Sequence, residues 1–66
     1  MINRLEYNIK ILKRLQFLLY TFSDWRFTQL LSNLGLDKDR FYEEPDKTLE
    51  TIDKWINEHN LVMYQL

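Results

Sequence analysis

The chain has 66 residues, of which 45% are hydrophobic and 15% aromatic, and its formal net charge is −1. A chain of this length forms one hydrophobic core, so we expect a single domain over residues 1–66. It contains no cysteine, which excludes a disulfide framework, a thiolate nucleophile and a cysteine-based zinc site and favours a reducing, cytoplasmic setting.

The charges divide unevenly between the two halves of the chain. Residues 1–33 have five basic and two acidic side chains, a balance of +3, whereas residues 34–66 have four basic and eight acidic ones, a balance of −4. The halves could attract each other within one domain or offer two oppositely charged faces to partners. The most apolar stretch, residues 15–22, is far shorter than the roughly 20 residues of a membrane-spanning helix, and we expect neither a membrane segment nor a signal peptide.

The first predicted helix spans residues 2–20. One apolar stripe has helical spacing throughout and consists of Leu5, Ile9, Leu12, Leu15, Leu19 and Phe22. A second stripe lies beside it and consists of Ile11, Leu15, Leu18 and Phe22. Because the stripes merge toward residue 20, we expect the end of this helix to be wrapped by the rest of the chain or covered by another molecule.

The second predicted helix spans residues 24–34. Thr21 and Asp24 match a capping box, and Ser23 is an equally good N-cap, so the start is uncertain by two residues. Four apolar residues are expected on the core face: Phe27, Leu30, Leu31 and Leu34. The only glycine, Gly35, is expected to end the helix in a Schellman motif, with Leu36 folding back onto Leu31.

The third predicted helix spans residues 46–59. Pro45 suits its first turn, and the acidic residues Glu43, Glu44 and Asp46 suit the positive end of its dipole. The buried stripe is predicted to be Leu49, Ile52 and Ile56, with Trp55 at its flank. Residues 61–66 are too apolar to be solvated; they could continue the helix, pair with a second chain or pack as an extended arm, which we favour. The fold class is therefore all-α, a three-helix domain with an ordered C-terminal arm.

The sequence offers little support for catalysis. The single histidine, His59, lies at a helix end, where a structural role is expected. Adjacent carboxylates at Glu43 and Glu44 point in different directions and do not match a calcium loop. One glycine cannot form a phosphate-binding loop. We expect no enzyme activity, no cofactor and no metal site.

Nucleic-acid binding is an alternative. Lys10, Lys13, Arg14 and Arg4 give the first helix a modest basic face, and a short helix follows it, as in helix-turn-helix proteins. However, nucleic-acid-binding domains usually have a strong basic excess, which this chain lacks. A solvated helix face is the better interpretation of these residues.

Protein binding fits the composition better. The residue types enriched at interface hot spots are spread along the chain at Trp25, Arg26, Tyr42, Trp55, Met63 and Tyr64. In so small a domain several of these rings must form the core. We expect Phe27 and Trp55 in the core and Trp25, Tyr42 and Tyr64 at the surface.

Residues 25–33 read W-R-F-T-Q-L-L-S-N, and residues 41–44 read F-Y-E-E. Over residues 23–52 the chain resembles a family of short uncharacterised bacterial and phage proteins, whose pattern is approximately D-x-R-F-G-Q-L-L-x-N followed by F-Y-x-E-D-D-x-L. It departs from that pattern at Thr28, where glycine is usual, and at Pro45, where an acidic residue is usual. The resemblance implies a small helical fold and no activity, and it suggests a phage- or prophage-encoded inhibitor or adaptor that binds a host protein.

Arg26, Gln29 and Asn33 have helical spacing and should line one polar ridge of the second helix. Arg26 could pair with Glu43 or Glu44 and hold the loop to the helices, which we favour, or the ridge could be a recognition surface. The expected partner-binding residues are Trp25, Arg26, Gln29, Asn33, Tyr42 and Tyr64. The sequence thus predicts a small cytoplasmic protein-binding module, with a nucleic-acid-binding regulator and a homodimeric structural module as alternatives.

Overall fold

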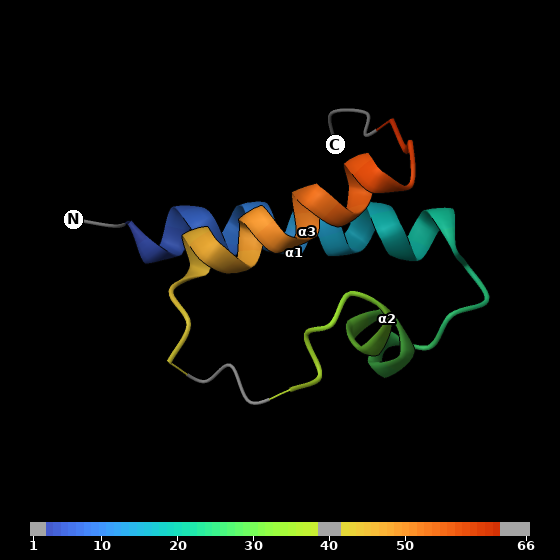
Figure 1. Ribbon diagram of the computed structural model, residues 1–66, viewed down its shortest axis with the longest axis horizontal. Helices are drawn as coiled ribbons and strands as arrows, with labels where there is room; N and C mark the ends of the chain where they lie inside the picture. The colour runs from blue at the N-terminus through green and yellow to red at the C-terminus, as the bar shows by residue number, and fades with distance from the viewer. Residues whose placement is uncertain (1–2, 39–41, 63–66) are drawn as a thin grey trace.

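The computed structural model describes residues 3–38 and 42–62 as three helices: α1 (Arg4–Thr21), α2 (Phe27–Asn33) and α3 (Pro45–Glu58). The described part of the chain contains no strand. Helices α1 and α3 lie side by side and run in the same direction, and α2 lies crosswise on one side of this pair (Figure 1). The predicted all-α, three-helix fold is therefore confirmed. None of the helices in the described ranges is long and apolar enough to cross a bilayer.

Side chains at the start of α1 and α3 favour helix formation there. The Asn3 side chain caps α1 by accepting a hydrogen bond from the Glu6 amide at 3.1 Å, which supplies a partner that the first turn lacks. Pro45 is the first residue of α3, where its missing amide costs no helical hydrogen bond. The predicted start of the third helix is thus correct to one residue.

Two Schellman motifs end the shorter helices. At the end of α2, Gly35 has a φ of +76°, and the Leu36 amide donates to the Leu31 carbonyl at 2.8 Å. At the end of α3, Asn60 has a φ of +56°, and the Leu61 amide donates to the Ile56 carbonyl at 3.1 Å. In both motifs the left-handed residue reverses the chain direction, so that a following amide donates a hydrogen bond to a carbonyl in the last turn of the helix. The sequence predicted this helix end for Gly35.

The predicted start of α2 is wrong by three residues. Thr21 does not cap α2: it is the last residue of α1, and its hydroxyl donates to the Phe17 carbonyl at 2.9 Å. The following residues form a tight turn in which the Trp25 amide donates to the Phe22 carbonyl at 2.9 Å. Helix α2 then begins at Phe27 with Arg26 as its N-cap and without a side-chain cap. The capping pattern failed because the previous helix already uses its threonine.

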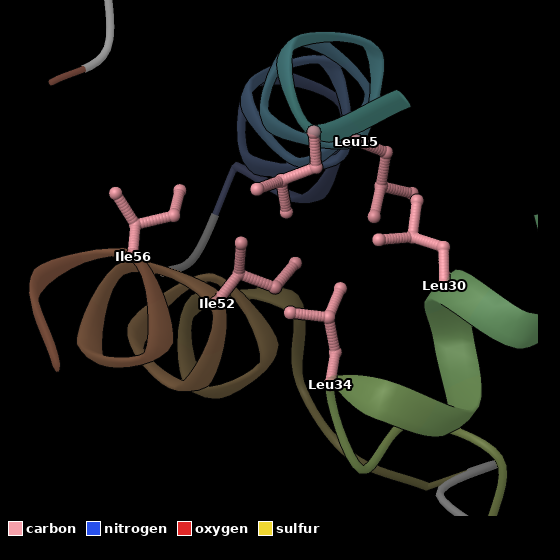
Figure 2. Packing of buried hydrophobic residues seen from close by; sticks show 6 residues of the cluster. Leu15, Leu30, Leu34, Ile52 and Ile56 are labelled. Carbon is pink, nitrogen blue, oxygen red and sulfur yellow. The ribbon is translucent and has the colours of Figure 1, made fainter. Parts of the chain in front are cut away.

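The core lies where the three helices meet. Its buried residues come from all three helices and the residue after α2: Leu15, Leu18, Leu30, Leu34, Leu49, Ile52 and Ile56. Side chains from the three elements point toward one another (Figure 2). Each fully buried leucine or isoleucine stabilises the fold by about 1.5 to 3 kcal/mol relative to an exposed one. The predicted core stripe of the third helix is confirmed.

The first apolar stripe of α1 is buried only in its second half, where Leu15 is in the core and Leu19 and Phe22 pack against it. Leu5, Ile9 and Leu12 are 69%, 44% and 63% exposed, because α2 and α3 cover the neighbouring stripe that contains Leu15 and Leu18. Phe27 was predicted in the core but is 50% exposed, since it begins a helix whose core contact is made one turn later.

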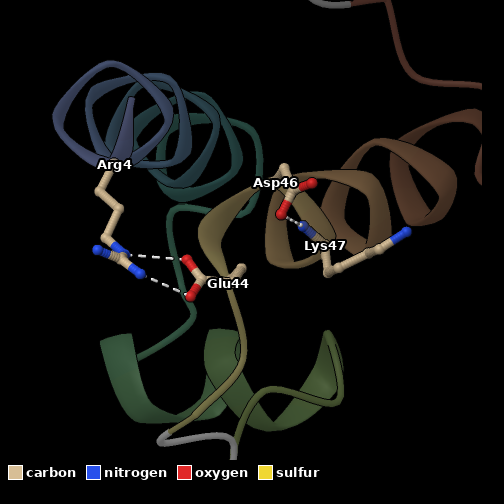
Figure 3. A network of polar contacts seen from close by, with 4 residues as sticks. All are labelled: Arg4, Glu44, Asp46 and Lys47. Carbon is tan, nitrogen blue, oxygen red and sulfur yellow. Dashed lines mark hydrogen bonds and ion pairs between the residues drawn. The ribbon is translucent and has the colours of Figure 1, made fainter. Parts of the chain in front are cut away.

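Two cross-helix ion pairs align α1 with α3. The Arg4 guanidinium donates to both carboxylate oxygens of Glu44 at 2.9 and 2.7 Å (Figure 3), and the Arg14 Nε donates to Asp53 at 3.0 Å. In both pairs a basic residue of the first half meets an acidic residue of the second half. The uneven charge distribution therefore acts within the domain, which was the first of the two interpretations of the sequence.

Only part of the predicted C-terminal arm can be placed. Leu61 is half-buried against the core cluster, and Val62 is exposed. Residues 63–66 of the predicted arm lie outside the described residues.

Substituting Gly35 with alanine tests the Schellman end of α2. No atom lies within 4 Å of an added Cβ, so the cost is that of a left-handed backbone with a side chain. We expect Gly35→Ala to destabilise the fold by about 1 kcal/mol, or roughly 4 to 8 °C in Tm. The matched change Asn60→Gly should not lower Tm. Equal melting curves for wild type and Gly35→Ala would contradict this account.

The Arg4–Glu44 pair predicts a pH dependence of stability. The hydrogen bonds from Arg4, together with its charge, hold the pKa of the Glu44 carboxyl below its usual value. A carboxyl with a lowered pKa in the folded state stabilises the fold above its unfolded pKa, and this contribution is lost as the pH falls through the folded pKa. Between neutral pH and about pH 3, wild type should therefore lose more Tm than Glu44→Gln. The difference between the two proteins should shrink in high salt because the ion pair is exposed. Parallel Tm profiles of wild type and Glu44→Gln between these pH values would contradict the stabilising role of the pair.

Candidate functional site

Four rings gather where α1 and α3 end. Phe22 and Trp25 are stacked, with centroids 4.2 Å apart and planes inclined by 9°, because the tight turn after α1 brings positions i and i+3 together. Trp55 of α3 meets both rings edge-on, at 6.0 and 6.3 Å. The parallel packing of α1 and α3 places their C-terminal ends side by side (Figure 1), and this makes the contact between the turn and Trp55 possible.

His59 covers the outer side of this cluster. Its ring stacks on Trp55 with centroids 3.7 Å apart and an interplanar angle of 20°. Its Nδ1 lies 2.8 Å from the Trp55 carbonyl oxygen, and because a carbonyl oxygen only accepts, Nδ1 is the protonated nitrogen. His59 therefore has the structural, helix-ending role that the sequence predicted.

A shallow pocket opens between α2 and these rings. It is lined by Phe22, Trp25, Asn33, Trp55 and His59. The three large rings are half-buried and pack against the core, whereas the Asn33 and His59 side chains are exposed. We call this surface the aromatic pocket. It combines apolar ring faces with two polar groups at its edge.

The structure brings some of the predicted partner-binding residues together and separates others. Trp25 and Asn33 both line the aromatic pocket, and Arg26 and Gln29 are exposed on the same short segment as Asn33. Tyr42 is 91% exposed and lines a different pocket, next to Arg4 and Glu44. Tyr64 lies outside the described residues.

The predicted clamp between Arg26 and the acidic loop does not form. Glu44 pairs with Arg4, and Glu43 accepts a hydrogen bond from the Thr48 hydroxyl at 2.6 Å. Arg26 is exposed, and within residues 3–38 and 42–62 it makes no ion pair. The reason is geometric: Glu44 precedes α3 at the end of the molecule where α1 starts, whereas Arg26 follows the end of α1.

Three members of the aromatic pocket were not predicted as site residues: Phe22, Trp55 and His59. The sequence contained a local signal for each contact, since Phe22 is three residues before Trp25 and Trp55 is four residues before His59. These spacings bring side chains together in a turn and on a helix, respectively. The contact of Phe22 and Trp25 with Trp55 requires the tertiary packing of α1 and α3 and has no local signal.

The basic face of α1 is largely neutralised. Arg4 and Arg14 pair with Glu44 and Asp53, and Lys10 lies 3.4 Å from the Glu6 carboxylate. This leaves few basic groups to contact a phosphate backbone. Among the described residues, no group of three or more potential metal ligands is found.

No protein-family model, curated protein or solved structure matches this chain. The case for a binding surface therefore depends on the geometry of the described residues.

Substituting Arg26 with alanine separates a structural role from a surface role. Because Arg26 makes no side-chain cap bond and is exposed, we expect Arg26→Ala to change the free energy of unfolding by less than about 0.5 kcal/mol. Trp55→Ala, which removes a ring packed on the core, should lower Tm clearly in the same thermal melts. A large fall in Tm for Arg26→Ala would restore the clamp hypothesis.

Proposed function

We propose that this chain is a small, non-enzymatic protein-binding module that contacts its partner through the aromatic pocket and the adjoining polar ridge of Arg26, Gln29 and Asn33. The observation that supports the proposal is that Asn33 lies in the wall of a pocket formed by aromatic rings. An apolar centre beside exposed polar side chains is the usual arrangement of a protein interface.

The residue types suit such a role. Tryptophan and arginine are enriched among the side chains that dominate binding energy, and such residues work best when a rigid base holds them. Here Trp25 is held by its stack on Phe22 and by the edge of Trp55, so little conformational entropy would be lost when a partner docks. The pocket would receive an apolar or aromatic side chain, and the Gln29 and Asn33 amides would supply donors and acceptors around it.

The resemblance of residues 23–52 to short bacterial and phage proteins supports a host protein as the partner. An inhibitor or adaptor of phage or prophage origin needs only a binding surface and a stable fold, and a domain of this size can supply both. Nucleic-acid binding has less support, because Arg4, Lys10 and Arg14 already have carboxylate partners.

Affinity capture from a bacterial host lysate, quantified by mass spectrometry, tests the proposal. The bait proteins are wild type, the double variant Gln29→Ala/Asn33→Ala and the control Lys47→Ala, which changes an exposed residue at the opposite end of α3. We expect one protein to be retained by wild type and by the control, and to be depleted about tenfold by the double variant, which corresponds to the loss of one strong contact. Thermal melts should show that all three baits are folded.

Retention of no specific protein by wild type would contradict the proposal. Equal retention by wild type and by the double variant would place the binding surface elsewhere on the molecule.

A further inference from the structure

Helix α1 has an exposed apolar row that its own core does not use. Leu5, Ile9 and Leu12 are all exposed, and Leu5 and Ile9 line a shallow pocket on this face. The core is built from the neighbouring stripe, which includes Leu15 and Leu18. The core that the described residues form is therefore complete without the row, which leaves the row accessible to a second molecule.

The spacing of the row is that of a coiled-coil seam. Leu5, Ile9, Leu12, Gln16 and Leu19 are separated by four, three, four and three residues. This alternation repeats every seven residues, with leucine at the d positions, isoleucine at one a position and glutamine at the other. Leu19 already packs against the core, so the accessible part of the seam runs from Leu5 to Gln16.

The charges beside the seam complement each other when two copies run in opposite directions. Glu6 and Lys13 flank it at successive e positions. Lys10 lies near Glu6 and over the Tyr7 ring at 5.3 Å, whereas Lys13 has no ion pair within the described residues. An antiparallel pair places Glu6 of each copy next to the partner's Lys13. A parallel pair would instead place Lys13 opposite the partner's Asn8 and leave the carboxylate without a cross-chain cation.

We propose that the α1 seam binds a second copy of this chain, with the two α1 helices packed antiparallel about a two-fold axis. In this arrangement Ile9 faces the partner's Leu12, Leu5 faces the partner's Gln16, and two Glu6–Lys13 pairs close the edges. Each contact occurs twice, as two-fold symmetry requires. This surface lies between Leu5 and Gln16 of α1 and shares no residue with the aromatic pocket, so the inference does not depend on the proposed function.

The seam has few layers, so the dimer is weak and depends on concentration. For so short a helix–helix interface we expect a dissociation constant between roughly 1 µM and 1 mM. Sedimentation equilibrium over that range should show a monomer converting to a dimer. The variant Ile9→Glu, which buries a charge in the centre of the seam, should remain monomeric at every concentration and retain the circular dichroism of a folded helical protein. A wild type that stays monomeric up to about 1 mM, or an Ile9→Glu protein that still dimerises, would overturn the proposal.

Exchange of the flanking charges tests the orientation. Lys13→Glu and Glu6→Lys should each raise the dissociation constant by about twofold to thirtyfold, because each loses two exposed cross-chain ion pairs. The double variant Glu6→Lys/Lys13→Glu should recover most of the wild-type affinity. The same three changes made in the Ile9→Glu monomer serve as controls. They measure how each change alters the stability of the monomer, so that this effect can be separated from its effect on dimerisation. Failure of the double variant to recover affinity would exclude the antiparallel arrangement.

Discussion

The parallel packing of α1 against α3 is the constraint on which the rest of the molecule depends. Buried side chains of both helices hold the pair together, and two ion pairs, Arg4 with Glu44 and Arg14 with Asp53, connect the helices at two levels. Arg4 and Arg14 are ten residues apart and Glu44 and Asp53 are nine residues apart, so the two helices run in the same direction. Parallel neighbours cannot be joined by a short hairpin. The connection between α1 and α3 is therefore long, and α2, which belongs to it, closes the core with Leu30 and the following Leu34.

The same packing explains why the aromatic pocket lies where it does. Both helices end at one end of the molecule, so the turn after α1 and the last turns of α3 bring Phe22, Trp25 and Trp55 into contact. Helix α2 ends in a Schellman motif at Gly35, and Asn33, in its last turn, joins the pocket wall. A pocket of this kind needs no long loop or ligand to shape it, because helix ends and one tight turn supply all of its walls.

Local signals predicted the local features of this fold. Pro45 predicted the start of α3, Gly35 the end of α2, and the stripe of Leu49, Ile52 and Ile56 the buried face of α3, because proline, left-handed glycine and helical periodicity act over a few residues. Periodicity could not decide which of two apolar stripes of α1 is buried, since that depends on which neighbours pack against it. The predicted partner of Glu44 was wrong for the same reason. Arg4 and Arg26 are both basic, and only the direction of α1 relative to α3 determines which of them lies near Glu44.

Aligned helices also make the molecule electrically polar along its length. Each helix has a partial positive charge at its start and a partial negative charge at its end, and in a parallel pair these add instead of cancelling. Acidic side chains offset the positive end, with Glu6 and Asp46 in the first turns, but neither α1 nor α3 has a basic residue in its last turn. The aromatic pocket, which includes residues at the ends of α1 and α3, lies near this negative pole. The two helix ends therefore favour a positively charged group near the pocket over a negatively charged one.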